Sequence, residues 1–403
     1  MSSEHTYEIL IVGSNSTSIG VARSLAEKSI PCTIIDRDFN GWGARSKYAD
    51  TIIQGSDDLV ESLVNLGKEK KQILYLSRDR DVLTVTKNRN ILEKYYVFNL
   101  PDYETSKKYI NKNLCYQFLE REKLPFPKAK FFNSVNKLSS INPTGFEYPL
   151  IIKIFLQKAE FINSQDELMK FLERIKDKTK PVVMQKYIEG PTENIFFVFC
   201  YFDKYNNCLA AFSGHKIRDY PHLAGNTTFA GSFYNQSLIN KTVKIFQKYR
   251  MVGYCSMEYK YNKNRNEYEI IEPTVGRFNL QIMLATKSGI NFPHIMYQDL
   301  SNMMVDCASS YAIQKDNIYW VNEFQDFLAV KKSKGPITWL TWLKQLIRAD
   351  VFVVTDKNDL QTLFYSIYFY TVKKINKLVS ELYRIWKIQT LLKTKPKEIN
   401  ERK

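Results

Sequence analysis

Charged residues stand inside or beside apolar segments between residues 153 and 279, where ordinary solvated charges are not expected. Lys153 is the first, in the middle of PLIIKIF. Burying a lysine in so apolar a strand costs free energy unless its ammonium meets an anion. We therefore take Lys153 as a candidate anion-binding residue. The alternative is an edge lysine whose ammonium reaches water.

A second cationic pair follows in the segment GHKIRDYP. Lys216 and Arg218 are two residues apart there, so a strand would present both on one face. Two cations on one face could hold a polyphosphate or a carboxylate. The alternative is an exposed basic strand face.

Two glutamates belong to strands that a short polar turn connects. Glu258 lies in CSMEYK, Glu272 lies in IIEPT, and YNKNRNE separates the two segments. A hairpin would bring the carboxylates together, and a paired set of carboxylates suits a hard cation such as Mg²⁺. Asn279 could add a neutral oxygen ligand, and Arg277 could orient a phosphoryl group or a substrate carboxylate. The alternative is that both glutamates are solvent-facing strand ends.

The segment QKYIEGPTEN begins as a strand and breaks at Gly190 and Pro191. Such a break could present backbone groups to an adenine edge and a carboxylate to a ribose. Glu189 and Glu193 are the candidate carboxylates. On its own, the segment could equally be a plain loop.

The elements that must position these residues begin with a β-α-β pattern. Apolar strands are predicted at 7–13, 31–36 and 72–77, which favours a parallel sheet. Gly13 and Gly20 flank a Ser/Asn/Thr-rich turn, but their spacing is not that of a dinucleotide fingerprint. We interpret the segment as a tight turn, with substrate contact as the alternative.

Beyond a helix predicted at 106–122, strands dominate from about 145 to 305, with helices at 164–176 and 237–250. This is typical of an α+β core. After 310 the chain becomes helical and basic, with Trp339, Trp342, Leu343 and Leu346 on one helical face. That face could lie on a membrane surface or pack against the core or a second subunit.

Composition narrows the function classes. The formal net charge is +16, which indicates either anionic ligands or simply a lysine-rich composition. No nucleic-acid-binding signature accompanies the charge. The six cysteines form no CxxC pair and the four histidines are too few for a histidine-built metal site. Without a signal-peptide pattern or a spanning apolar segment, we expect a cytoplasmic protein.

In their order and chemistry, these segments resemble the ATP-grasp superfamily. More narrowly, they are similar to the carboxylate–amine ligases that include D-alanine–D-alanine ligase and D-aspartate ligase. The resemblance extends over residues 8–300. It implies an α/β and α+β ATP-grasp fold: a Rossmann-like pre-ATP-grasp domain at 1–105, an ATP-grasp domain at 106–305 and a basic helical C-terminal extension at 306–403.

The resemblance also implies roles for individual residues. INKNLCYQFLEREKLPFPKAK resembles the family segment in which a lysine opens a helix, and GHKIRDYP resembles a GxKxRxxP strand of the D-aspartate-ligase-like branch. The implied ATP ligands are Lys112, Lys153, Gln185, Lys186, Ile188, Glu193 and Lys216. The implied catalytic residues are Lys216, Arg218 and Arg277. The implied ligands of Mg²⁺ (or Mn²⁺) are Glu258, Glu272 and Asn279.

The implied activity is an ATP-dependent ligase that joins a small-molecule carboxylate to an amine or thiol through an acyl phosphate. Such a protein could form a homodimer. One rival is a degenerate ATP-grasp protein that binds nucleotide without turnover, because 153–164 contains no glycine where the family has a glycine-rich loop. Another is a ligase bound peripherally to a membrane through its C-terminal helices, acting on lipid-linked precursors.

Overall fold

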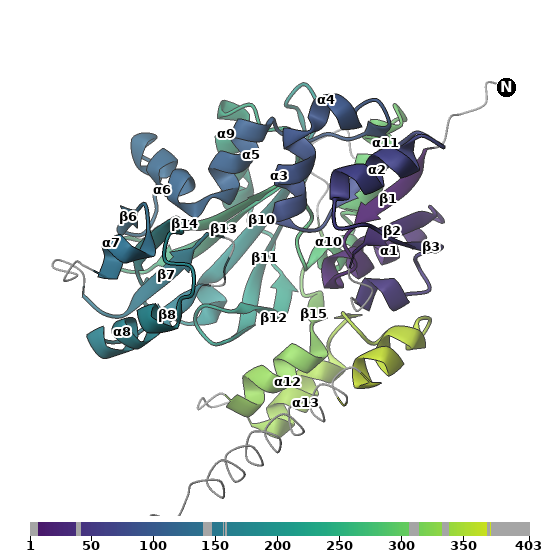
Figure 1. The fold of residues 1–403 in the computed structure, drawn as a ribbon. Coiled ribbons are helices and arrows are strands. Elements are labelled where there is room, and N and C mark those ends of the chain that lie inside the picture. Colours follow the sequence, from purple (N-terminus) through teal and green to yellow (C-terminus); the bar gives the residue numbers. More distant parts are fainter. Residues whose placement is uncertain are drawn as a thin grey trace, which may run out of the picture.

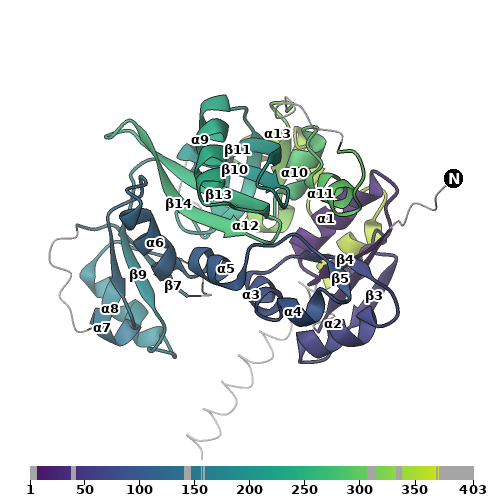
Figure 2. The ribbon, with the colours of Figure 1, turned by 90° about the horizontal axis from the view of Figure 1, so that it is seen from above.

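The computed structural model describes most of the chain. The described residues are 7–37, 42–139, 147–155, 157, 159–305, 314–332, 338–368 and 371. Within them, three β-sheets follow one another, each with its own helices (Figure 1; Figure 2 shows them from above). No helix in these ranges has the length and hydropathy needed to cross a bilayer.

The N-terminal sheet is parallel, with strand order β3-β2-β1-β4-β5. Its strands are β1 (Glu8–Val12), β2 (Cys32–Asp36), β3 (Thr51–Gln54), β4 (Gln72–Leu76) and β5 (Tyr96–Val97). Its helices are α1 (Ser16–Ala26), η1 (Trp42–Arg45), α2 (Leu59–Gly67), α3 (Asp79–Lys87) and α4 (Arg89–Leu92). The predicted β-α-β opening is therefore confirmed.

The loop between β1 and α1 is closed by hydrogen bonds of its own. Gly13 has φ +97°, a conformation that favours glycine. The Asp36 carboxylate accepts from the N–H and hydroxyl of Ser14 and from the Arg78 guanidinium. Asn15 caps α1 by accepting from the N–H groups of Thr17 and Ser18. These contacts give a tight turn in which Asp36 is already engaged.

The helix predicted at 106–122 is in fact two helices, α5 (Tyr103–Ile110) and α6 (Lys112–Arg121). Asn111 separates them in an extended conformation, with φ −78° and ψ 106°. Its side chain accepts from the N–H groups of Asn113 and Leu114, so it starts α6 as an N-cap. The break places Lys112 in the first turn of α6, beside the central sheet.

A small antiparallel sheet has the order β6-β9-β7-β8. Its strands are β6 (Ala129–Phe132), β7 (Leu150–Ile154), β8 (Glu160–Ile162) and β9 (Val182–Lys186). Two helices, α7 (Val135–Ser139) and α8 (Gln165–Arg174), pack their apolar residues on one face of it. All five residues of β7 are buried.

The central sheet has seven strands in the order β14-β13-β10-β11-β12-β15-β16. They are β10 (Ile195–Phe202), β11 (Cys208–Tyr220), β12 (Asn226–Ser232), β13 (Gly253–Asn262), β14 (Glu267–Val275), β15 (Tyr319–Val321) and β16 (Val351–Phe352). The accompanying helices are η2 (Thr192–Asn194), α9 (Gln236–Lys248), α10 (Ile282–Lys287), α11 (Phe292–Leu300), α12 (Glu323–Lys332) and α13 (Trp339–Ile347). Two apolar clusters fill the space between this sheet and the N-terminal domain.

The sequence predicted a helical C-terminal segment, but the structure also contains two short strands there. These are β15, which pairs with β12, and β16, which pairs with β15. Both strands have three residues or fewer, which is too short to show a strand period. Residues 306–313, 333–337, 369–370 and 372–403 lie outside the described residues.

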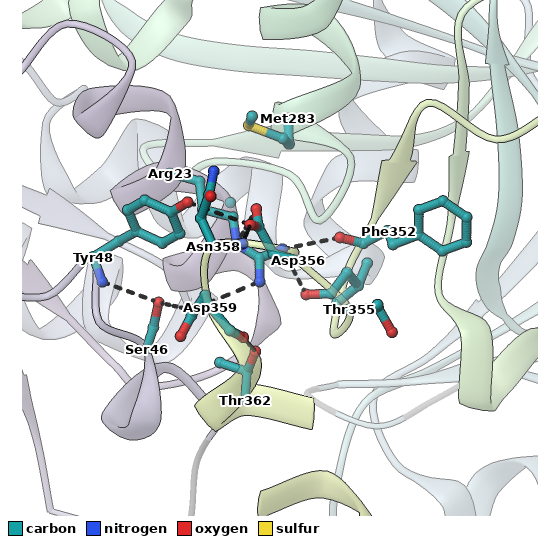
Figure 3. Close-up of polar contacts among 12 residues, drawn as sticks. Arg23, Ser46, Tyr48, Met283, Phe352, Thr355, Asp356, Asn358, Asp359 and Thr362 are labelled. Atoms are coloured by element: carbon teal, nitrogen blue, oxygen red, sulfur yellow. Dashed lines mark hydrogen bonds and ion pairs between the residues drawn. The ribbon is translucent and has the colours of Figure 1, made fainter. Parts of the chain in front are cut away.

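Arg23 of α1 ties this segment to the N-terminal domain (Figure 3). Its Nη1 donates to the carbonyl oxygens of Phe352 and Val353 at 2.9 and 3.0 Å. Its guanidinium also lies 3.8 Å from Asp359, whose carboxylate accepts from the Ser46 hydroxyl at 2.5 Å. The buried arginine thus joins two parts of the chain that are more than 300 residues apart.

Candidate active site

The centre of the site is a pair of glutamates on the β13–β14 hairpin. Glu258 of β13 lies directly opposite Glu272 of β14 in the antiparallel register. The hairpin predicted from the sequence is therefore confirmed. Both side chains line a cavity of about 500 Å³ whose walls also include residues of α3, α5, α6 and β11.

Each glutamate is held by its own lysine. Nζ of Lys216 donates to Oε2 of Glu258 at 2.9 Å, and Nζ of Lys112 donates to Oε1 of Glu272. The two lysines come from β11 and from the start of α6, so three parts of the chain meet here. The arrangement balances two carboxylates with two ammonium groups.

The local charges shift the pKa values of these groups. Burial works against the charge of Glu272, but the ammonium groups of Lys112 and Lys153 outweigh it and lower its pKa to about 2. Burial also opposes the charge of Lys112 and Lys216, but their glutamate partners outweigh it and raise the pKa of both lysines. The Glu272 carboxylate and the Lys112 and Lys216 ammonium groups are therefore charged at neutral pH.

Lys153 extends this charged cluster from the neighbouring sheet. It is buried on β7, and its Nζ donates to the hydroxyl of Tyr116 and to the carbonyl oxygen of Ile271, each at 2.8 Å. Burial and the nearby Lys112 lower its pKa to about 8. Among the described residues, no carboxylate is hydrogen-bonded to its ammonium, so of these three lysines it is the one best placed to accept a new anion.

A smaller cavity of about 90 Å³ adjoins the first and shares the wall that contains Lys216, Glu258 and Glu272. It is lined by apolar side chains and by polar and charged ones from strands of both the small and the central sheet. The lining residues that the sequence analysis named are Lys153, Gln185, Ile188, Lys216, Glu258 and Glu272. The structure therefore brings these residues together around one apolar recess with a charged rim.

Two expected nucleotide ligands lie outside both cavities. The Lys186 side chain is exposed and lies 3.7 Å from Glu147, and the Glu193 side chain is exposed in η2. Neither is among the residues that line the two cavities as described. Only the backbone of Lys186 remains close, because it precedes the lining residues Tyr187 and Ile188.

Arg218 also departs from its expected position beside Lys216. A bulge in β11 falls between the two residues. Arg218 is buried, makes a bidentate ion pair with Asp326 of α12 at 2.8 and 2.9 Å, and stacks 4.7 Å from the Phe229 ring centre. The structure therefore gives Arg218 a contact with α12 rather than with the cavity.

Arg277 and Asn279 do line the larger cavity. The Arg277 guanidinium pairs with Asp79 at the start of α3. Burial opposes this charge, but Asp79 outweighs it and raises the pKa of Arg277. Oδ1 of Asn279 accepts from the Tyr254 hydroxyl at 3.1 Å, which leaves the oxygen a second lone pair.

Two residues of the site were missed at the sequence level. The Tyr116 hydroxyl accepts a hydrogen bond from the Lys153 ammonium and donates one to Oε1 of Gln185 at 2.6 Å. Lys260 lines the smaller cavity and donates to the Tyr187 hydroxyl and the Gly190 carbonyl, both at 3.0 Å. The spacing in the sequence could have identified both residues. Tyr116 is one helical turn after Lys112, and Lys260 is two residues after Glu258, on the same face of the strand.

The donor set suits a magnesium ion that also binds phosphate oxygens. The described residues contain no group of three or more His, Cys, Asp or Glu side chains that could hold a metal alone. Mg²⁺ commonly uses one or two carboxylates and takes its other ligands from phosphates and water. Glu258, Glu272 and the amide oxygen of Asn279 fit that requirement.

Comparison with known proteins relates this architecture to a set of solved structures. No protein-family model matches the chain, and neither does any curated protein sequence. The ADP complex of N5-carboxyaminoimidazole ribonucleotide synthetase matches with a TM-score of 0.61 at 14% identity, covering 79% of this chain and 81% of that chain. Carboxyaminoimidazole ribonucleotide synthase from Aspergillus clavatus, complexed with ATP, gives 0.60 at 12% identity, covering 78% and 81%.

A third match is the biotin carboxylase domain dimer of 2-oxoglutarate carboxylase from Hydrogenobacter thermophilus, solved with MgADP, ADP and bicarbonate. Its TM-score is 0.57 at 14% identity, covering 78% of this chain and 73% of that chain. At such identities the likeness concerns the fold, and the narrower relation to D-alanine–D-alanine and D-aspartate ligases is not resolved by it. The chain has the ATP-grasp fold, with an N-terminal parallel Rossmann-like sheet and antiparallel sheets around the candidate site.

Proposed function

We propose that the chain is an ATP-dependent ligase that joins a carboxylate to an amine or thiol through an acyl phosphate. One observation carries the proposal. The opposed pair Glu258 and Glu272 stands on the wall shared by a small recess and a larger cavity, close to the buried Lys153 and Lys216 and the half-buried Lys112. We propose that a nucleotide base enters the recess once it widens, that an acceptor occupies the larger cavity, and that the phosphates lie along the charged wall between them.

In the absence of nucleotide, the lysines and glutamates neutralise one another. We propose that the phosphates exchange these partners: Lys112, Lys153 and Lys216 turn to phosphate oxygens, and Glu258, Glu272 and Asn279 are freed as oxygen ligands. Mg²⁺ bound there would offset the charge of the transferred phosphoryl group.

The chemical steps follow from this placement. A substrate carboxylate oxygen attacks the γ-phosphorus, and the bond from that phosphorus to the β-phosphate oxygen breaks. ADP departs and the substrate becomes an acyl phosphate. An amine or thiolate then attacks the acyl carbon and inorganic phosphate departs. We propose that Arg277, which pairs with Asp79 on the wall of the larger cavity, orients the carboxylate or the leaving phosphate.

The nucleotide recess must widen during the cycle. Its volume of about 90 Å³ is well below the roughly 300 Å³ of the smallest typical ligand sites. The small sheet and the central sheet are connected here by residues 187–190, and Gly190 has φ +123°. We propose that the small sheet moves about this hinge to admit the nucleotide, and that Lys260 re-forms its bonds to Tyr187 and Gly190 on closure.

A hydroxylamine assay tests the proposal directly. An acyl phosphate reacts with hydroxylamine to give a hydroxamate, so MgATP, hydroxylamine and a panel of carboxylates (amino acids, sugar acids, bicarbonate) should yield ADP and a coloured or mass-detected adduct with one member. Hydroxamate formation that depends on both ATP and a carboxylate supports the proposal. ATP hydrolysis that no carboxylate stimulates, and that yields no adduct, contradicts it.

A nucleotide-binding protein without turnover is the second candidate. The stretch 153–164, which follows the nucleotide lysine, contains no glycine to form a flexible cover over phosphates. This candidate predicts saturable MgATP binding with no ADP formation in the presence of any carboxylate and amine pair.

A further inference from the structure

Two helices of the C-terminal segment turn apolar side chains toward solvent. The chain is helical over residues 360–368, and Leu360, Phe364, Ile367 and Tyr368 are 48–66% exposed there. Their spacing of four, three and one residues places them on one helical face. In Figure 1 this yellow helix lies with α12 and α13 along the lower edge of the molecule.

The opposite face of the 360–368 helix is polar, and it is the face that the protein buries. Thr362 and Ser366 are fully buried, as is Asp359 just before the helix. Asp359 binds Ser46 and approaches Arg23, and the Thr362 hydroxyl donates to the carbonyl oxygen of Val354 (Figure 3). Only Leu363 adds an apolar contact to the core from this helix, so polar side chains supply most of the inward contacts while the exposed apolar side chains point outward.

Helix α13 likewise turns apolar side chains outward, although Trp342 on its inward side also packs on Phe327 of α12. Its inward side carries polar contacts: the Trp342 indole donates to Asp326 at 2.9 Å, and Gln345 accepts from Arg218 at 2.5 Å. Leu340, Leu343 and Ile347 form the outward side, and Ile347 is 84% exposed. None of the nine residues of α13 is buried.

The acidic and basic side chains of this segment differ in where they lie. Every acidic side chain in the described part of 323–368 accepts a hydrogen bond or an ion pair from the protein itself; these are Glu323, Asp326, Asp350, Asp356 and Asp359. The basic side chains are all exposed; these are Lys331, Lys332, Lys344, Arg348 and Lys357. The outward surface therefore combines apolar residues with positive charge.

We propose that this surface, made of Leu340, Leu343, Lys344, Ile347, Arg348 and the 360–368 apolar face, docks the protein onto an anionic lipid surface. Apolar side chains flanked by lysine and arginine are the pattern of helices that lie in the interface of a bilayer. Aromatic residues such as Phe364 and Tyr368 suit the headgroup level. Attraction to anionic lipids adds to the burial of the apolar face.

A second copy of the chain is a poorer occupant. A two-fold interface places the same patch on both partners, so two basic patches would be brought together, and the described acids that could balance them are already engaged. A lipid surface supplies both an apolar phase and negative headgroups. Docking onto a lipid surface does not depend on the nucleotide site and does not consume ATP.

Vesicle co-sedimentation of the full chain tests the proposal, with phosphatidylcholine vesicles beside vesicles that contain phosphatidylglycerol. We expect binding to the anionic vesicles that weakens with added salt. Leu340→Ser with Phe364→Ser should weaken it at least about tenfold, as should Lys344→Glu with Arg348→Glu. Ile91→Ser on α4, at a comparably exposed apolar residue away from the patch, should leave it unchanged.

Circular dichroism of each variant checks that the fold is retained, and Lys344→Glu with Arg348→Glu alters only exposed side chains. Absence of binding to anionic vesicles overturns the proposal. So does binding that neither pair of substitutions weakens. Dimers in solution that dissociate in Leu340→Ser with Phe364→Ser, without vesicle binding by the wild type, would assign the face to a second copy instead.

Discussion

Glu258 and Glu272 face each other across two hydrogen-bonded strands, and each is neutralised by a different lysine. Like charges placed directly opposite on a sheet are normally destabilising. Here Lys216 and Lys112 offset that cost. Under the proposed function, a magnesium nucleotide would displace these internal pairs, so that the two lysines bind phosphate and the two glutamates bind the cation.

Substitution Glu272→Gln should separate metal-dependent chemistry from folding. The amide keeps the shape of the side chain but lacks the negative charge that a cation requires. We expect ADP formation to fall about 100-fold, with a higher Mg²⁺ requirement, measured by coupled assay across a magnesium titration. Glu267→Gln on the same strand is the matched control; equal rates in both variants would contradict a metal role for Glu272.

Substitution Lys260→Met should affect nucleotide binding more than chemistry. Lys260 holds the hinge through Tyr187 and Gly190 but lies beyond the glutamate pair. We expect the KM for ATP to rise about 10–100-fold, because a hydrogen bond of a charged group contributes about 1.5–3 kcal/mol, with little change in kcat. Lys263→Met, at an exposed position of the same hairpin, should change neither constant. A fall in kcat with an unchanged KM would show that the lysine acts on the reacting groups.

Arg218 should prove to be a structural residue. Substitution Asp326→Ala leaves its buried guanidinium without an anionic partner, and we expect the free energy of unfolding to fall by about 3–5 kcal/mol. Arg218→Met combined with Asp326→Leu should recover most of that loss, because neither charge remains buried. Denaturant unfolding gives both values. If the double variant keeps its stability but loses nucleotide affinity, Arg218 has the catalytic role that the sequence suggested.

The Asp36 carboxylate should make the free energy of unfolding depend on pH. Burial alone would raise its pKa, but the Ser14 N–H and the Arg78 guanidinium outweigh burial and hold the pKa below 3.8. Its contribution is therefore fully present above that value and is lost as the pH falls through the lower folded pKa. Asp36→Asn should cost about 2 kcal/mol near neutral pH, and the difference from wild type should shrink in acid. A difference that stays constant with pH would show that the charge of Asp36 is not what matters.

The parts of the fold that local sequence patterns encode were predicted correctly. The parallel opening and the hairpin carrying Glu258 and Glu272 follow from strand period and a polar turn. The break at Asn111 was missed because the apolar spacing continues through it, and only its capping side chain marks the boundary.

Features that depend on distant partners could not be predicted. The partner of Arg218 is 108 residues away, and a bulge in β11 turns the two cations of that strand to different neighbours. Equally, nothing local shows that the apolar faces of α13 and residues 360–368 point outward, since an amphipathic pattern does not say which side the protein covers.

Thermal unfolding with and without MgATP tests the nucleotide site most directly. At about a hundred times its dissociation constant, a ligand stabilises the folded state by roughly 2.7 kcal/mol. We expect that increase in wild type and in Lys244→Met, which changes an exposed lysine of α9. Lys153→Met and Glu272→Gln should lose it. No stabilisation of the wild type at millimolar nucleotide, or full stabilisation of both site variants, would contradict the account.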